Sequence, residues 1–117
     1  MILVVGGLGA GKREYVKREY GYADDDIAAG TLDGRPVAAD VQELAGKGGD
    51  EEALFSALLR KNVVICNEVG CGVVPLDAAD RAWRDAVGRL CARLAARADR
   101  VVRVCCGLPI VMKDTKP

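Results

Sequence analysis

The chain has 117 residues, of which 50% are apolar and 29% are charged. A chain of this length buries about two-thirds of its unfolded surface around one core, so we expect one domain over residues 1–117 that needs no disulfides. The 17 basic and 17 acidic residues cancel, which argues against nucleic acid or an anionic membrane as a partner and favours small molecules or further copies of the chain.

Cysteine use and the first residues predict a cytoplasmic protein. None of the five cysteines lies in a Cys-x-x-Cys pair of the kind that binds zinc or cycles between redox states. We expect Cys66, Cys105 and Cys106, which lie in apolar runs, to be buried and reduced. Residues 1–7 lack a basic segment and hold too few apolar residues for a signal peptide or a membrane span.

The sequence contains no histidine and few hydroxyl side chains. The absence of histidine excludes from this chain a Ser-His-Asp triad, a Cys-His pair, a histidine-ligated metal and a phosphohistidine or guanylyl-histidine intermediate. The serine and threonine residues are Thr31, Ser56 and Thr115. A mechanism with a hydroxyl nucleophile has only these candidates, and none lies in a recognisable motif.

The first residues predict a strand, a glycine loop and a helix in immediate succession. Residues 2–5 are apolar and mostly β-branched, which is typical of a strand buried on both faces. Residues 12–20 place Val16 and Tyr20 on one helical stripe, and Gly21 follows as a helix stop. The glycine-rich residues between them form the loop.

The middle of the chain predicts turns followed by two short helices. Residues 21–36 are rich in aspartate and glycine and are typical of surface turns, with a short strand near Ile27. Apolar residues recur at helical spacing in residues 37–46 and again in residues 50–61, where Asp50 is a candidate N-cap. No strand that ends in an aspartate is recognisable in this part of the chain.

Residues 62–66 repeat the buried-strand pattern and lead into a polar loop that begins with Asn67 and Glu68. Such loops at strand ends are where open α/β sheets bind their ligands. An apolar stripe over residues 79–95 then predicts one long helix, with Asp77 as its candidate cap.

The last two predicted strands are residues 101–106 and 108–113, the second at a sheet edge because Pro109 cannot donate a ladder hydrogen bond. Strands that alternate with helices predict a mainly parallel sheet flanked by helices. The fold class is therefore α/β, similar to P-loop NTPases.

The loop after the first strand matches the pattern Gly-x-x-x-x-Gly-Lys of a phosphate-binding loop. Its residues are Gly6, Gly7, Leu8, Gly9, Ala10, Gly11 and Lys12. Glycines let backbone N–H groups approach phosphate oxygens, and the lysine ammonium reaches the outer phosphates. The alternative is a plain glycine turn that packs the helix close to the sheet. The fingerprint of a dinucleotide-binding loop fits these residues less well, because Lys12 stands where that fingerprint has its third glycine.

Arg13 occupies the position at which this motif has a serine or threonine that ligates Mg²⁺. Two unit charges 4 Å apart repel by about 4 kcal/mol at an effective dielectric constant of 20, and the repulsion doubles for Mg²⁺. Either Arg13 turns outward along the helix, or nucleotide binds with little help from Mg²⁺ and Arg13 neutralises phosphate charge.

Other polar residues leave alternatives open. Glu68 is the best-placed carboxylate to orient Mg²⁺, a water or an incoming hydroxyl, and its alternative role is to brace the loop by hydrogen bonding. The predicted long helix also has an arginine-rich face that could contact nucleotide phosphate, a neighbouring subunit or only solvent. Its members are Arg81, Arg84, Arg89, Arg93 and Arg97.

Several segments resemble the adenosylcobinamide kinase/adenosylcobinamide-phosphate guanylyltransferase family, which makes the nucleotide loop of cobalamin. The similar residues are 2–12, the Asn67-Glu68-Val69-Gly70 run and its continuation to Pro75, Arg81, Trp83-Arg84-Asp85, Gly88-Arg89, Arg93-Leu94-Ala95 and 101–113. The resemblance implies a P-loop fold, GTP or ATP as the bound nucleotide, a corrinoid substrate and a homo-oligomer.

In the leading hypothesis Lys12 and Glu68 are catalytic, because Lys12 neutralises the transferred phosphate and Glu68 positions the acceptor or the metal. The expected nucleotide site comprises residues 6–12, Arg13, Asn67 and Glu68. The family's guanylylated histidine has no counterpart in this chain, and Cys91-Ala92 stand where the family tends to have Asn-Gln. Phosphate transfer to the adenosylcobinamide hydroxyl is the leading hypothesis. The alternatives are a non-catalytic nucleotide-binding or regulatory module and an oligomeric structural subunit.

Overall fold

In the computed structural model, which describes residues 1–46, 49–69 and 78–115, six strands form one sheet in the order β2-β3-β4-β1-β5-β6. The strands are β1 (Ile2–Gly6), β2 (Ile27–Ala29), β3 (Val37–Ala39), β4 (Val63–Asn67), β5 (Arg100–Cys105) and β6 (Leu108–Asp114). The helices are α1 (Lys12–Tyr20), α2 (Glu51–Leu59), α3 (Ala78–Arg97) and the 3₁₀-helices η1 (Asp24–Asp26) and η2 (Val41–Glu43).

All strand pairs are parallel except the last. β1 lies at the centre and pairs in parallel with β4 and β5. β3 extends the sheet beyond β4, and β2 extends it beyond β3, again in parallel, whereas β6 runs antiparallel to β5 at the edge. The predicted mainly parallel α/β sheet is confirmed, and the carboxyl ends of β3, β4, β1 and β5 therefore meet along one edge of it.

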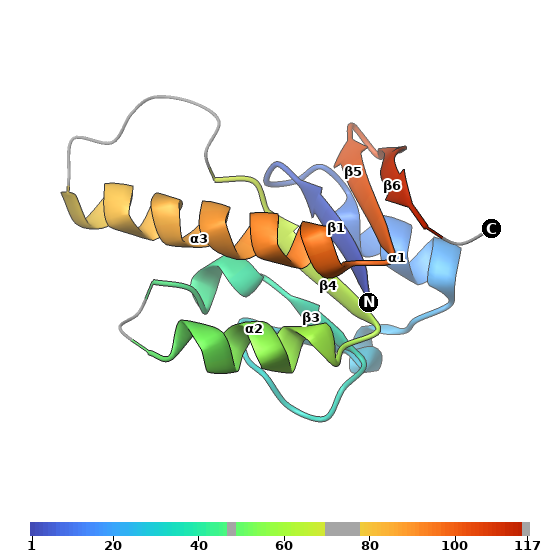
Figure 1. Cartoon of the computed structure of the whole chain (residues 1–117). Helices are drawn as coiled ribbons and strands as arrows, with labels where there is room; N and C mark the ends of the chain where they lie inside the picture. The colour runs from blue at the N-terminus through green and yellow to red at the C-terminus, as the bar shows by residue number, and fades with distance from the viewer. Residues whose placement is uncertain (47–48, 70–77, 116–117) are drawn as a thin grey trace.

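Helices cover both faces of the sheet, with α2 and α3 on one face and α1 on the other (Figure 1). Leu3 and Val64 point toward α2 and α3 and pack in one core with Phe55, Leu58 and Leu94. The adjacent strand residues point the other way, because successive side chains of a strand alternate between faces. That second core holds Val4, Tyr15, Val16, Ile65 and Val102.

The helix ends follow the capping signals of the sequence. The predicted helix over residues 12–20 is confirmed, and it ends at Gly21, whose φ of 76° suits glycine. Asp50 is the N-cap of α2, where its side chain accepts hydrogen bonds from the N–H groups of Glu52 and Ala53 at 3.0 and 3.1 Å. The short strand expected near Ile27 is also present.

The helix predicted for residues 37–46 is wrong. Residues 37–39 form β3 and are fully buried, and only Val41–Glu43 is helical, as the single turn of η2. A short apolar run of this kind is compatible with a buried strand or a buried helix, and periodicity does not distinguish them. The interior of the sheet decides for the strand, because β3 pairs on both sides.

The expected burial of the cysteines is confirmed only for Cys66, which is fully buried in β4. Cys105, at the end of β5, and Cys106, in the turn to β6, are exposed. The predicted loop over residues 70–75 and the predicted cap Asp77 lie outside the described residues. None of the helices in the described parts of the chain is long and apolar enough to cross a bilayer.

The close packing at the end of β1 gives a stability prediction. A Cβ on Gly6 would lie 2.5 Å from the carbonyl oxygen of Val104, whereas a Cβ on Gly7 would meet no atom within 4 Å. We expect Gly6→Ala to lower the free energy of unfolding by about 1–3 kcal/mol, because β5 has to move away from β1. Gly7→Ala is the matched control for chemical denaturation, and equal destabilisation by both variants would contradict the packing argument.

Candidate functional site

The glycine loop leaves β1 and is held against the turn between β5 and β6. The N–H of Ala10 donates to the Gly7 carbonyl at 3.2 Å, and the N–H of Gly107 donates to the Ala10 carbonyl at 2.8 Å. Gly9 and Gly11 have φ values of 72° and 94°, which lie in the left-handed region that favours glycine. The loop therefore turns twice and delivers the chain directly into α1.

Lys12 begins α1, and its side chain is only 7% exposed. Its Nζ donates to the Gly7 carbonyl at 2.7 Å, so the ammonium lies inside the glycine loop. Burial lowers the pKa of Lys12 from its ordinary value, while the nearby charges of Asp40 and Glu68 act in the opposite direction. The ammonium is thus a partly desolvated cation with carboxylates from two other strands in its surroundings.

Asp40 follows β3 directly and contacts the first turn of α1. Its Oδ2 lies 2.5 Å from a terminal nitrogen of Arg13, and its φ of 52° places a non-glycine residue in the left-handed region. The view that no strand here ends in an aspartate is therefore wrong. The sequence signal for this strand was the short apolar run of residues 37–39 before Asp40. It was interpreted instead as the start of a helix over residues 37–46.

Glu68 follows β4 and forms a two-pronged ion pair with Arg103 of β5. Nε of Arg103 lies 2.9 Å from Oε1 of Glu68, and NH2 lies 3.0 Å from Oε2. The N–H of Glu68 also donates to the Gly6 carbonyl at 2.8 Å. The Glu68 carboxylate is therefore oriented by a cation, and Arg103 is a site residue that was not predicted from the sequence. The sequence signal for Arg103 was a charged residue within the otherwise apolar run of residues 101–106.

Two cavities flank the loop and contain the predicted site residues. One cavity of about 420 Å³ adjoins η2 and is lined by Leu8, Gly9, Gly11, Lys12, Arg13, Asp40, Gln42 and Asn67, among others. The other, of about 520 Å³, adjoins β5 and is lined by Gly7, Leu8, Gly9, Ala10, Glu68 and Arg103, among others. Gly6 lines neither cavity, because it is the last residue of β1.

A third, mostly apolar cavity of about 350 Å³ lies between the sheet and α3, with Glu68 at its lining. Val5, Cys91 and Met112 contribute to its wall. The sulfur of Cys91 lies 3.4 Å from that of Cys66, and this contact together with burial raises the pKa of the Cys66 thiol. Sequence reasoning missed this cavity, because its wall combines residues from strands and helix that are far apart in the chain.

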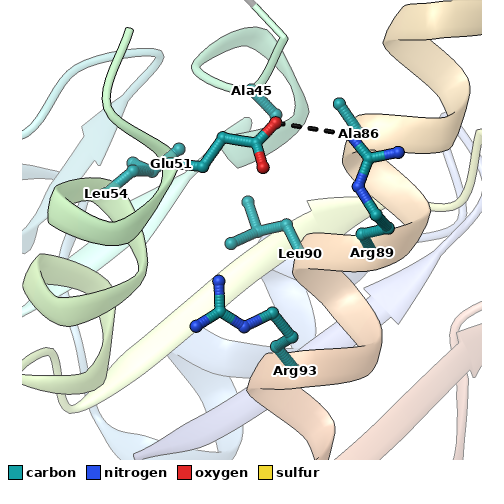
Figure 2. Close-up of a pocket in the computed structure, with 7 residues that line it drawn as sticks. All are labelled: Ala45, Glu51, Leu54, Ala86, Arg89, Leu90 and Arg93. Atoms are coloured by element: carbon teal, nitrogen blue, oxygen red, sulfur yellow. Dashed lines mark hydrogen bonds and ion pairs between the residues drawn. The ribbon is translucent and has the colours of Figure 1, made fainter.

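The arginine-rich face of α3 is partly used to hold α2 (Figure 2). Arg89 lies 3.3 Å from Glu51, and Arg93 lies 2.8 Å from Glu52 and above the ring of Phe55. These contacts surround a cavity of about 110 Å³ between the two helices, on the face of the sheet opposite α1. Both arginines remain exposed to solvent, by 60% and 41% of their side chains, while they contact α2.

The residues next to Lys12 do not fit a Mg²⁺ ion, which favours near-octahedral coordination by oxygen ligands. Arg13 stands in the place of a hydroxyl ligand, and the carboxylate of Asp40 already pairs with the Arg13 guanidinium. Across residues 1–46, 49–69 and 78–115, no group of three or more His, Cys, Asp or Glu side chains is arranged to hold a metal ion.

Comparison with known proteins identifies a family over most of the chain. The model of the family described as cobinamide kinase / cobinamide phosphate guanyltransferase matches residues 36–112. The match includes Asp40, Asn67, Glu68 and Arg103, whereas the glycine loop lies outside it.

Two curated relatives are similar over shorter stretches. A bifunctional adenosylcobalamin biosynthesis protein of Salmonella typhimurium is 45% identical over 53 residues, which are 45% of this chain and 29% of the relative. A protein of the same description from Pseudomonas aeruginosa is 37% identical over 68 residues, which are 56% of this chain and 39% of the relative. The aligned part of the chain therefore spans well under half the length of these relatives.

Gln42 ties the carboxyl end of β4 to its neighbours and gives a second stability prediction. Its side chain is 5% exposed, its Oε1 accepts the N–H of Asn67 at 3.0 Å, and its carbonyl accepts the indole N–H of Trp83 at 2.8 Å. We expect Gln42→Leu to lower the free energy of unfolding by about 1–3 kcal/mol, because the N–H of Asn67 loses its acceptor. Glu43→Leu, at the exposed next position, is the control in urea denaturation, and an equal effect would reject this role.

Proposed function

The chain belongs to the cobinamide kinase / cobinamide phosphate guanyltransferase family, and on that premise we propose that it is a nucleotide-binding phosphotransferase of cobalamin biosynthesis. It holds GTP or ATP on residues 6–12 and transfers a phosphate to the hydroxyl of adenosylcobinamide. The observation that carries the proposal is the meeting of Lys12, Asp40, Glu68 and Arg103 at the carboxyl edge of adjacent parallel strands.

Phosphate transfer requires positioned cations and a group that handles the proton of the incoming hydroxyl. Lys12 supplies a buried positive charge within the glycine loop, and it moves from the Gly7 carbonyl to a phosphate oxygen when nucleotide binds. Glu68 accepts the hydrogen bond and then the proton of the acceptor hydroxyl, as the hydroxyl oxygen bonds to the transferred phosphorus and nucleoside diphosphate leaves. Arg103 positions the Glu68 carboxylate through two contacts, and so acts through Glu68.

The apolar cavity beside Glu68 supports binding of an acceptor there. Its wall includes Val5, Val87 and Met112, and its polar residues include Asn67 and Glu68. A hydrocarbon segment that ends in the acceptor hydroxyl matches this distribution, since apolar surface provides affinity and a few polar groups set orientation. Guanylyl transfer through a histidine is not proposed, because this chain contains no histidine.

The second candidate is a non-catalytic nucleotide-binding or regulatory module, and the ion pair between Arg13 and Asp40 favours it. Phosphoryl transfer in P-loop proteins uses a metal ion to neutralise developing charge, and here the strand-end carboxylate is engaged by a side chain of the protein. Both candidate functions include binding of the nucleotide, but only the first includes transfer of its phosphate to an acceptor.

Calorimetric titration of ATP and GTP into Lys12→Met tests the nucleotide site. We expect at least about a tenfold loss of affinity relative to wild type, because a charge-assisted contact to phosphate is lost. Arg18→Met, at an exposed position of α1, is the matched control and should bind as wild type does. The proposed site is wrong if folded wild type binds neither nucleotide or if both variants behave alike.

Incubation of wild type with nucleotide and adenosylcobinamide separates the two candidates. Glu68→Gln should reduce product formation by about 10²-fold or more with little change in nucleotide affinity, since Glu68 acts on the acceptor. Nucleotide binding by wild type without any phosphorylated product would favour the non-catalytic module.

We also propose that the chain forms homo-oligomers through the edge of the sheet at β6. The large apolar side chains of this strand are exposed: Leu108 by 68%, Ile110 by 51%, Val111 by 49% and Met112 by 62%. An unpaired strand edge with such side chains is a surface for association. If the chain is instead an oligomeric structural subunit, which is the third alternative from the sequence, it would associate through the same surface.

Sedimentation of the purified chain tests this association. We expect wild type to sediment as an oligomer and Ile110→Lys to shift it toward monomer, because a charge at the strand edge opposes pairing. Ser56→Lys, at an exposed position of α2, controls for the added charge. A monomeric wild type would reject the proposal.

A further inference from the structure

The first turn of α1 places two cations beside the glycine loop. Lys12 is buried within the loop, and Arg13 follows it with a side chain that is 44% exposed. Both line the same cavity of about 420 Å³, together with Gly9 and Gly11. Arg13 thus does not turn away along the helix, which was one of the two outcomes left open by the sequence.

Asp40 holds Arg13 at this cavity. The carboxylate reaches it from the end of β3, on a residue whose φ of 52° lies in the left-handed region that non-glycine residues rarely adopt. The contact at 2.5 Å engages one terminal nitrogen of the guanidinium. Since a guanidinium carries five N–H donors in a rigid fork, it can stay paired with Asp40 and still donate to a phosphate oxygen.

Together these observations indicate that the Arg13 guanidinium occupies the place at which other phosphate-binding loops hold Mg²⁺. The hydroxyl ligand of the usual motif is absent, and the carboxylate that would approach the metal is paired with the guanidinium that replaces the hydroxyl. A divalent cation entering here would have to displace Arg13 and remain next to Lys12, against the repulsion of both.

We propose that Arg13 supplies the positive charge that Mg²⁺ supplies in other phosphate-binding loops, so that this site takes a metal-free nucleoside triphosphate. The inference rests on the proposed function, since it names the form of nucleotide that the same loop binds. It goes beyond that function because the family match begins at residue 36 and does not reach Arg13.

The proposal predicts how Mg²⁺ affects binding. The complex of Mg²⁺ with ATP carries two fewer negative charges than free ATP, and the loop already provides Lys12 and Arg13 as neutralising groups. Wild type should therefore bind ATP in EDTA at least as tightly as in excess Mg²⁺, whereas a loop with a hydroxyl at this position should gain affinity when Mg²⁺ is added.

The test is calorimetric titration of ATP, in EDTA and in excess Mg²⁺, into wild type, Arg13→Ser and Arg18→Ser. Arg13→Ser restores the hydroxyl of the usual motif, and Arg18→Ser makes the same change at an exposed position of the same helix. Urea denaturation of each variant establishes that it is folded, which we expect because exposed ion pairs contribute little to stability.

We expect Arg13→Ser to lose about tenfold or more of the affinity for ATP in EDTA and to recover affinity when Mg²⁺ is added, while Arg18→Ser matches wild type in both buffers. Tightening of wild-type binding by Mg²⁺ of about tenfold or more would overturn the inference and leave the nucleotide site intact. Failure of folded wild type to bind ATP or GTP in either buffer would instead reject the proposed function, and the inference with it.

Discussion

The structure depends on the parallel pairing of β1 with β4 on one side and β5 on the other. In this register Gly6 lies opposite Asn67, and the carbonyl of Gly6 accepts the N–H of Glu68 at 2.8 Å. A side chain on Gly6 would collide with the backbone of Val104 on the other side. Three strands can end this close together only because β1 ends in glycine, and the glycine loop starts at the point where they meet.

The charges at this edge are arranged around Lys12. On one side Arg13 pairs with Asp40, and on the other Arg103 pairs with Glu68. In each pair the cation and the carboxylate come from different elements, so the two ion pairs tie α1 to β3 and β5 to β4. An anionic ligand placed on the loop would meet Lys12 and two arginines that carboxylates already hold in position, which lowers the cost of reorganising the two arginines when it binds.

The family match and the geometry support different parts of the site. Residues 36–112 belong to the family pattern and contain both carboxylates, whereas the glycine loop and Arg13 precede the match and are connected to it through contacts in the folded chain. The helices on the opposite face have their own charge pairs, between Arg89 and Glu51 and between Arg93 and Glu52. Those arginines stabilise the packing of α2 on α3 and are not part of the loop site.

The sequence alone determined the α/β class, the bounds of α1, the Asp50 cap, the edge position of the last strand and the glycine loop, because each depends on neighbouring residues and local backbone preferences. Only the tertiary structure decided that residues 37–39 form a strand, that Asp40 faces Arg13 and that Arg103 holds Glu68. The partners in the Arg13–Asp40 contact are 27 positions apart in the chain, and those in the Arg103–Glu68 contact are 35 positions apart. Strand order and register bring such distant residues together. A local pattern contains neither, so it could place the loop but could not predict which charges would surround it.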